Sequence, residues 1–195
     1  YKKEIAGFFT SHVMIMIYFL ALIATVFVSS MANFFVASDF TWLRWAATTT
    51  TSQLPQYFLQ SQDLFYRPLD KTIVYFLYSV FSFQPEGYHL FILFIHFLVV
   101  GGVYFLAQRL THSNLLGVLT AVIFALHPAH AENVFWFSSI PVALCALFII
   151  YAMIAFLYFR DKKSIVSYVI AVLLSALACF SYEQAIIIPL LLLAL

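Results

Sequence analysis

Long runs of apolar residues, separated by short polar segments, dominate this chain of 195 residues. Only 9% of the residues are charged, against about 25% in a typical soluble domain, and 65% are hydrophobic. So few charged groups cannot cover the surface of a soluble globule of this size. The sequence therefore predicts an all-α polytopic transmembrane bundle. It argues against a nucleic-acid partner, because no basic patch is present, and against a disulfide scaffold, because there are only 2 cysteines.

Six apolar runs follow one another, namely Val13–Val28, Leu90–Ala107, Leu115–Leu126, Val142–Phe159, Ile165–Cys179 and a last run from Ala185 to Leu195. A bilayer core takes about 20 helical residues to cross. The third run is short, so we expect its helix to continue into the polar residues that follow. Because the sequence begins with Tyr1 and stops inside the sixth run, we interpret residues 1–195 as one transmembrane domain, the N-terminal part of a longer protein. A signal peptide cleaved near Ser30-Met31-Ala32 is the alternative for the first run, whose length favours an uncleaved helix.

The topology depends on the apolar segment Lys71–Phe83. Its 13 residues would reach about 20 Å as a helix, too short to cross, and Pro85 and Gly87 are expected to end it. If it lies along the interface, six cations are cytoplasmic and three are outside. The cytoplasmic set is Lys2, Lys3, Arg109, Arg160, Lys162 and Lys163, and the outer set is Arg44, Arg67 and Lys71. A crossing segment would reverse this balance, so we predict an interfacial helix and a cytoplasmic N-terminus.

The first external loop then covers residues 32–88 and carries two interfacial helices. The first follows Asp39 and places Trp42 and Trp45 on one face, where indole rings favour the headgroup level. The second opens at Arg67-Pro68, with proline in the first turn. Six of the eight carboxylates also face outward in this topology: Asp39, Asp63, Asp70, Glu86, Glu132 and Glu183. This grouping predicts an extracytoplasmic site.

Two groups of polar residues in this loop, one around Asp39 and one around Arg67, suggest chemistry at the membrane surface. Asp39 could act as the general base on an acceptor hydroxyl, or it or Ser38 could cap the helix that follows, leaving one carboxylate oxygen free. Arg67 and Lys71 could hold a lipid phosphate at headgroup depth, whereas the alternative is a surface ion pair between Arg67 and Asp70.

Two further groups of polar residues lie at the ends of later apolar runs, one around Glu183 and one at His127–Glu132. Glu183 is suited to neutralise Arg67 or Lys71, or to help bind a cation. His127-Pro128-Ala129-His130-Ala131-Glu132 offers three potential ligands, His127, His130 and Glu132, for a divalent metal. We interpret this segment as the lining of a cavity for either a phosphate or a metal. Gly101-Gly102 is expected to let a neighbouring helix pack closely.

Four motifs in order connect the chain to a known family: F-Y-R-P-L (Phe65–Leu69), P-E-G-Y-H (Pro85–His89), A-L-H-P-A-H-A-E-N-V-F-W (Ala125–Trp136) and S-Y-E-Q-A-I-I-I-P-L (Ser181–Leu190). The series resembles the N-terminal half of GT-C fold membrane glycosyltransferases. The likeness is to the TMTC-like and protein-O-mannosyltransferase-like branch and its bacterial relatives.

The resemblance implies an inverting transfer of sugar from a polyprenyl-phosphate donor to a hydroxyl of a protein, lipid or glycan. It places the site on the extracytoplasmic face of a membrane, the inner membrane for a bacterial protein. Asp39 matches the base of that family and Arg67 its phosphate-binding residue, with Lys71, His127 and His130 beside it. The main alternative is a non-enzymatic carrier, flippase component or scaffold for lipid-linked sugars.

Overall fold

The computed structural model describes residues 2–60 and 65–195, with side chains for residues 11–60 and 65–195. Asp63 and the side chains of Lys2 and Lys3, which the topology prediction uses, therefore lie outside the described part. Every element within the described residues is an α-helix or a 3-10 helix, and these residues form no strand. The expected all-α class is confirmed.

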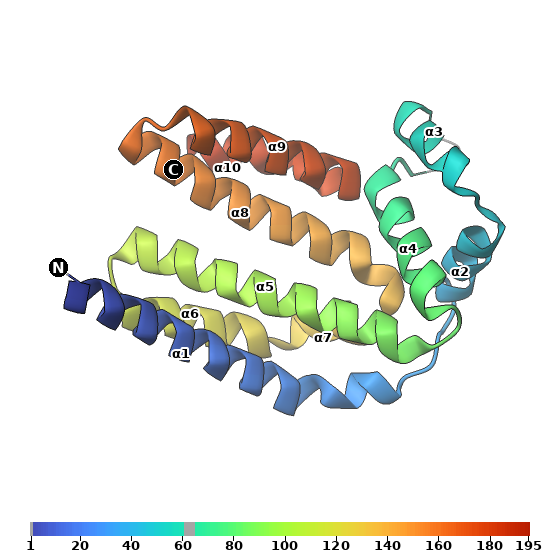
Figure 1. Cartoon of the computed structure of the whole chain (residues 1–195), viewed down its shortest axis with the longest axis horizontal. Coiled ribbons are helices and arrows are strands. Elements are labelled where there is room, and N and C mark those ends of the chain that lie inside the picture. The colour runs from blue at the N-terminus through green and yellow to red at the C-terminus, as the bar shows by residue number, and fades with distance from the viewer. Residues whose placement is uncertain (1, 61–64) are drawn as a thin grey trace.

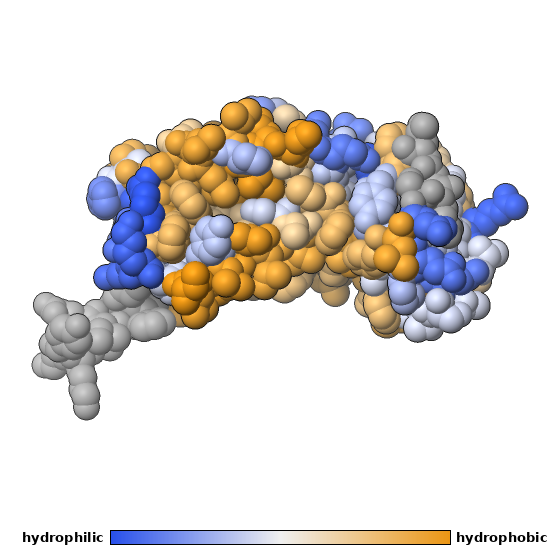
Figure 2. Space-filling model, turned by 90° about the horizontal axis from the view of Figure 1, so that it is seen from above, coloured by the Kyte–Doolittle hydropathy of each residue, from blue (hydrophilic) through white to orange (hydrophobic). Residues whose placement is uncertain are grey.

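Three long apolar helices have the length and composition of membrane spans. They are α1 (Lys2–Phe27) with its 3-10 continuation η1 (Val28–Ala32), α5 (Pro85–Thr111), and α8 (Ile140–Lys162). Figure 2 shows one face of the bundle, on which apolar residues fill the middle and hydrophilic residues lie toward both ends. Such a surface is suited to the hydrocarbon core of a bilayer, as expected for a polytopic membrane protein.

The third apolar run does not form one straight helix. α6 (Asn114–Leu126) ends at His127, whose extended backbone leads into η3 (Pro128–His130) and α7 (Ala131–Phe135). The two halves are bent by 54° and together would form a fourth span. Pro128 in the first turn of η3 lacks the N–H that a continuous helix would require. The predicted continuation of this helix therefore exists, but only after a break.

The last two apolar runs form short helices. α9 (Ile165–Ser181) has 17 residues and is followed by η5 (Glu183–Ile187) and α10 (Ile188–Leu193). At about 1.5 Å per residue α9 reaches about 25 Å, slightly less than the roughly 30 Å of a hydrocarbon core. Of the five complete spans expected, three are long helices and one is the bent pair, whereas α9 is an apolar helix shorter than these spans.

The first predicted loop forms a separate layer at one end of the bundle. It contains α2 (Asp39–Thr48), η2 (Thr51–Gln53), α3 (Leu54–Leu59) and α4 (Pro68–Phe81). These elements gather where α5 and α8 begin, and the α5–α6 and α8–α9 connections lie at the opposite end (Figure 1). We call these the α2–α4 end and the hairpin end. α4 is inclined to the bundle, as expected for a helix that does not cross the membrane.

Pro85 and Gly87 do not end the helix before the second span, contrary to the sequence prediction. α4 already ends at Phe81, where Ser82 takes a positive φ of 49°, and Pro85 is the first residue of α5. A Cβ on Gly87 would lie 2.2 Å from the Phe81 ring, so glycine allows the tight connection between α4 and α5. The second span therefore begins five residues before Leu90.

Close packing at the glycine pair confirms another expectation. A Cβ on Gly102 would lie 2.8 Å from Ile150 and 2.9 Å from Tyr151, both on α8. A Cβ on Gly101 would approach only the flexible end of Met16 on α1, at 3.3 Å. Gly102 thus brings α5 and α8 together, and these helices fix the relative positions of the two ends of the molecule.

Candidate functional site

An open pocket of about 450 Å³ lies between α2 and the start of α4. Its lining combines two cations, three aromatic side chains and two small hydroxyl groups: Ser38, Thr41, Trp42, Trp45, Phe65, Arg67 and Lys71. The pocket forms because Trp42 and Trp45 are one helical turn apart on α2, and because Arg67 precedes α4 while Lys71 lies in its first turn. The two residues predicted to hold a phosphate are therefore brought together.

Arg67 is held in a fixed orientation by Glu183. Its Nε donates to Oε1 at 3.0 Å, and its Nη2 donates to Oε2 at 2.8 Å. The guanidinium lies 4.5 Å from the ring centres of both Phe65 and Tyr182. Burial opposes the charge of Glu183, but the hydrogen bonds and positive charge of Arg67 outweigh it and lower the pKa of Glu183. The predicted neutralisation of Arg67 by Glu183 is confirmed, across 116 residues of sequence.

Lys71 is buried in an aromatic surrounding. Its side-chain nitrogen lies 4.7 Å from the centre of the Tyr57 ring and 5.6 Å from that of Trp45, within the range of cation–π attraction. The Trp45 Nε1 donates a hydrogen bond of 3.0 Å to the Tyr57 hydroxyl, which fixes both rings. Tyr57 was not predicted as a site residue, because α3 has only six residues and is too short to show a helical pattern in the sequence.

Asp70 does not form the predicted surface ion pair with Arg67. The residue is fully buried, and neither carboxyl oxygen has a hydrogen-bond partner within the described part of the chain. Burial raises the pKa of Asp70 from 3.8 to about 8; Arg67 opposes this rise and Glu183 adds to it. Asp70 is therefore mostly protonated at neutral pH and does not cancel the positive charge of the pocket.

Asp39 is buried beside the pocket and both of its oxygens accept hydrogen bonds. Oδ2 accepts from the Val36 amide at 2.9 Å, while Oδ1 accepts from the Ser138 amide at 2.8 Å and from the Ser138 hydroxyl at 2.5 Å. Ser138 lies in η4 (Phe137–Ser139), which leads into α8. The expected helix cap with one free oxygen is wrong, since the carboxylate connects two distant loops instead. No motif around Ser138 signalled this role.

The histidine segment lies apart from this pocket. His127 is exposed and its Nδ1 accepts from the Ala129 amide at 3.2 Å, whereas the His130 ring packs 4.2 Å from that of Phe124. Glu132 is exposed, and none of the three lines the pocket that holds Arg67 and Lys71. Within the described residues, no three His, Cys, Asp or Glu side chains come together as a metal site, so the suggested metal set is not assembled.

One family model matches most of the chain. It describes a 6-pyruvoyl-tetrahydropterin synthase related (PTPS-related) domain, a membrane protein, and it covers residues 64–195. The chain belongs to this family. Neither the curated proteins nor the solved structures contain a significant match. The matched region of this PTPS-related protein includes Arg67, Lys71, Ser138 and Glu183, whereas α2 with Asp39 precedes it.

Proposed function

We propose that this PTPS-related protein transfers a sugar from a polyprenyl-phosphate donor to an acceptor hydroxyl, with inversion, at the extracytoplasmic face of the membrane. The observation that carries the proposal is the pocket in which Arg67 and Lys71 lie beside Trp42 and Trp45. Cations suit the phosphate, and indole faces suit the apolar face of a sugar ring. Its place at the ends of membrane helices suits a donor whose lipid stays in the bilayer.

The charges of the pocket fit a departing phosphate. Arg67 and Lys71 both line the pocket, and burial raises the pKa of the neighbouring Asp70 to about 8, which reduces the negative charge beside them at neutral pH. Glu183 occupies the Nε and Nη2 edge of Arg67, and the Arg67 side chain, which is 15% exposed, lines the pocket where a phosphate would approach. Preorganised cations of this kind stabilise the charge that develops on the leaving oxygen.

Asp39 is the base in this proposal. The acceptor hydroxyl gives its proton to Asp39 while its oxygen forms a bond to the anomeric carbon, and the bond from that carbon to the phosphate oxygen breaks. Both oxygens of Asp39 now accept hydrogen bonds. The step therefore requires the Ser138 hydroxyl to turn away and free one lone pair of Oδ1. His127, His130, Glu132 and a divalent metal have no step in this mechanism.

A carrier or flippase component for lipid-linked sugars is the second candidate. It is favoured by the occupied carboxylate of Asp39, since a binding protein needs the phosphate pocket but no base. The two candidates share the pocket and differ in whether the sugar leaves its phosphate.

The test places the full-length protein in nanodiscs and supplies a panel of polyprenyl-phosphate sugars. Two quantities are measured, the binding of each donor and the release of its sugar. Arg67→Gln should lower both about tenfold or more, the effect of losing one charge-assisted contact. Arg44→Gln is the matched control, because Arg44 is exposed on α2 and does not line the pocket. Binding without release supports the carrier, and neither binding nor release with any donor refutes both candidates.

A further inference from the structure

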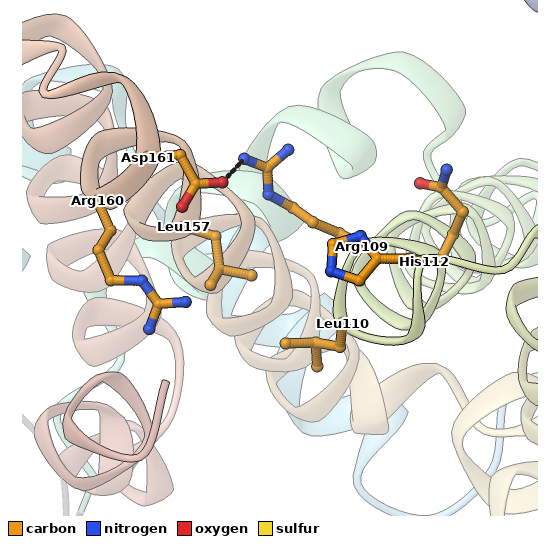
Figure 3. Close-up of a pocket in the computed structure, with 7 residues that line it drawn as sticks. Arg109, Leu110, His112, Leu157, Arg160 and Asp161 are labelled. Atoms are coloured by element: carbon orange, nitrogen blue, oxygen red, sulfur yellow. Dashed lines mark hydrogen bonds and ion pairs between the residues drawn. The ribbon is translucent and has the colours of Figure 1, made fainter.

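A second pocket, of about 410 Å³, opens at the hairpin end of the molecule. It lies where the last turns of α5 and α8 meet, and Figure 3 shows the side chains that surround it. Its lining is Gln108, Arg109, Leu110, His112, Leu157, Arg160 and Asp161. This pocket is at the opposite end of the bundle from Arg67 and Lys71, and nothing in the proposed function uses it.

The charge of this pocket is positive on balance. Arg109 donates to Asp161 through Nη2 at 2.7 Å and stacks 3.9 Å above the Tyr158 ring, so its charge is compensated and its orientation fixed. Arg160 is exposed and forms no hydrogen bond or ion pair with the described residues. In Figure 3 Arg160 and His112 lie on either side of Leu110 and Leu157.

Helix dipoles do not oppose an anion here. The carbonyl ends of α5 and α8 face this end of the molecule, but α6 begins at Asn114 and α9 at Ile165, directly after them. The amide ends of these helices therefore lie beside the carbonyl ends, and their partial charges cancel to first order. The side chains then determine the electrostatic potential, and Arg160 makes it attractive to an anion.

The walls and depth of the pocket favour a lipid. Leu110 is half-exposed and Leu157 is buried, so the cations stand beside an apolar floor. α5 and α8 both have the length of membrane spans and both end here, which puts the pocket at the depth of phospholipid headgroups. Basic pockets between membrane helices are common binding sites for anionic headgroups.

We propose that this pocket binds the phosphate of an anionic phospholipid in the leaflet at the hairpin end. Arg160 and His112 contact the phosphate, Arg109 adds a fixed positive charge, and Leu110 with Leu157 contacts the glycerol and the first acyl carbons. This site is independent of the sugar donor and of any transfer reaction.

The test is native mass spectrometry of the delipidated full-length protein, titrated with phosphatidylglycerol or with phosphatidylcholine. The wild type should retain phosphatidylglycerol preferentially. Arg160→Gln should weaken its binding about tenfold, the effect expected for one charge-assisted contact to phosphate. Lys162→Gln is the matched control, since Lys162 carries the same charge in the same last turn but does not line the pocket. The affinity of the Lys162→Gln variant for phosphatidylglycerol should stay within about twofold of that of the wild type.

Leu110→Trp gives an independent test, because a larger side chain fills the pocket without changing its charge. It should also lower retention of phosphatidylglycerol, even if the Arg160 variant does not fold. Equal losses in the Arg160 and Lys162 variants would overturn the proposal, as would equal retention of the two lipids. Displacement of the lipid by millimolar inorganic phosphate would assign the site to the free anion and overturn the lipid assignment.

Discussion

Replacing Asp39 tests whether this carboxylate holds the α2–α4 end together, because it accepts three hydrogen bonds from two separate loops. Asp39→Ala leaves the amides of Val36 and Ser138 without an acceptor, at about 1–3 kcal/mol for each buried amide. Because Val36 is exposed, water restores part of this loss. We expect Asp39→Ala to lower the free energy of unfolding by about 2–4 kcal/mol.

Two milder substitutions refine the prediction. Asp39→Asn keeps one acceptor oxygen for Ser138 but turns an NH₂ group toward the Val36 amide, and should cost about 1–3 kcal/mol. Ser138→Ala removes only the hydroxyl donor and should cost about 1 kcal/mol. Glu132→Gln is the control, an exposed carboxylate changed to an amide, and should stay within about 0.5 kcal/mol.

The assay is detergent-induced unfolding of the full-length protein in mixed micelles, with sugar release measured on the same preparations. If Asp39→Ala unfolds at the wild-type midpoint, the carboxylate does not connect the loops and the reasoning fails. The same series tests the chemistry. A base is supported if Asp39→Asn loses transfer while it stays folded and Ser138→Ala retains it. Transfer that only follows the folded fraction refutes the base.

Two further predictions concern buried positions. Asp70 has a raised pKa of about 8 in the fold. Its contribution to the free energy of unfolding is therefore fully present below about pH 4 and is lost as the pH rises to about 8, by roughly 6 kcal/mol at most. Asp70→Asn should remove this fall in the unfolding midpoint, and a variant that keeps the wild-type pH profile would contradict the burial argument. Gly102→Ala should destabilise the α5–α8 contact by about 1–3 kcal/mol in the same assay, because its Cβ meets Ile150 at 2.8 Å. Gly101→Ala, which meets only a flexible methionine, should cost less, and equal losses would refute this account.

The sequence alone was sufficient for the membrane class and for the approximate positions of the helices. Apolar runs of fixed length have few alternatives in a bilayer, where each backbone polar group must be bonded internally. The same local logic placed Pro68 at the start of α4 and predicted close packing at Gly102. It failed at Pro85, because proline suits the first turn of a helix as well as the end of the preceding one.

The site was only partly predictable. Arg67, Lys71 and Glu183 were named from residue type and from their place at the outer ends of the runs, and the structure brings them together. The metal set was not assembled: the His127 and His130 rings lie 5.9 Å apart, but within the described residues no third His, Cys, Asp or Glu joins them, and spacing in sequence cannot show this. Asp70 was expected at the surface and lies fully buried.

What only the tertiary structure determined is which distant residues meet. Ser138 lies 99 residues from Asp39, and Glu183 lies 116 residues from Arg67. No local pattern encodes such pairs, since they depend on how α5 and α8 pack and on where α4 packs against α5 and α9. Hydropathy is a property of each segment and can be read along the chain. A hydrogen bond between distant residues is a property of two segments, and it forms only once the bundle has folded.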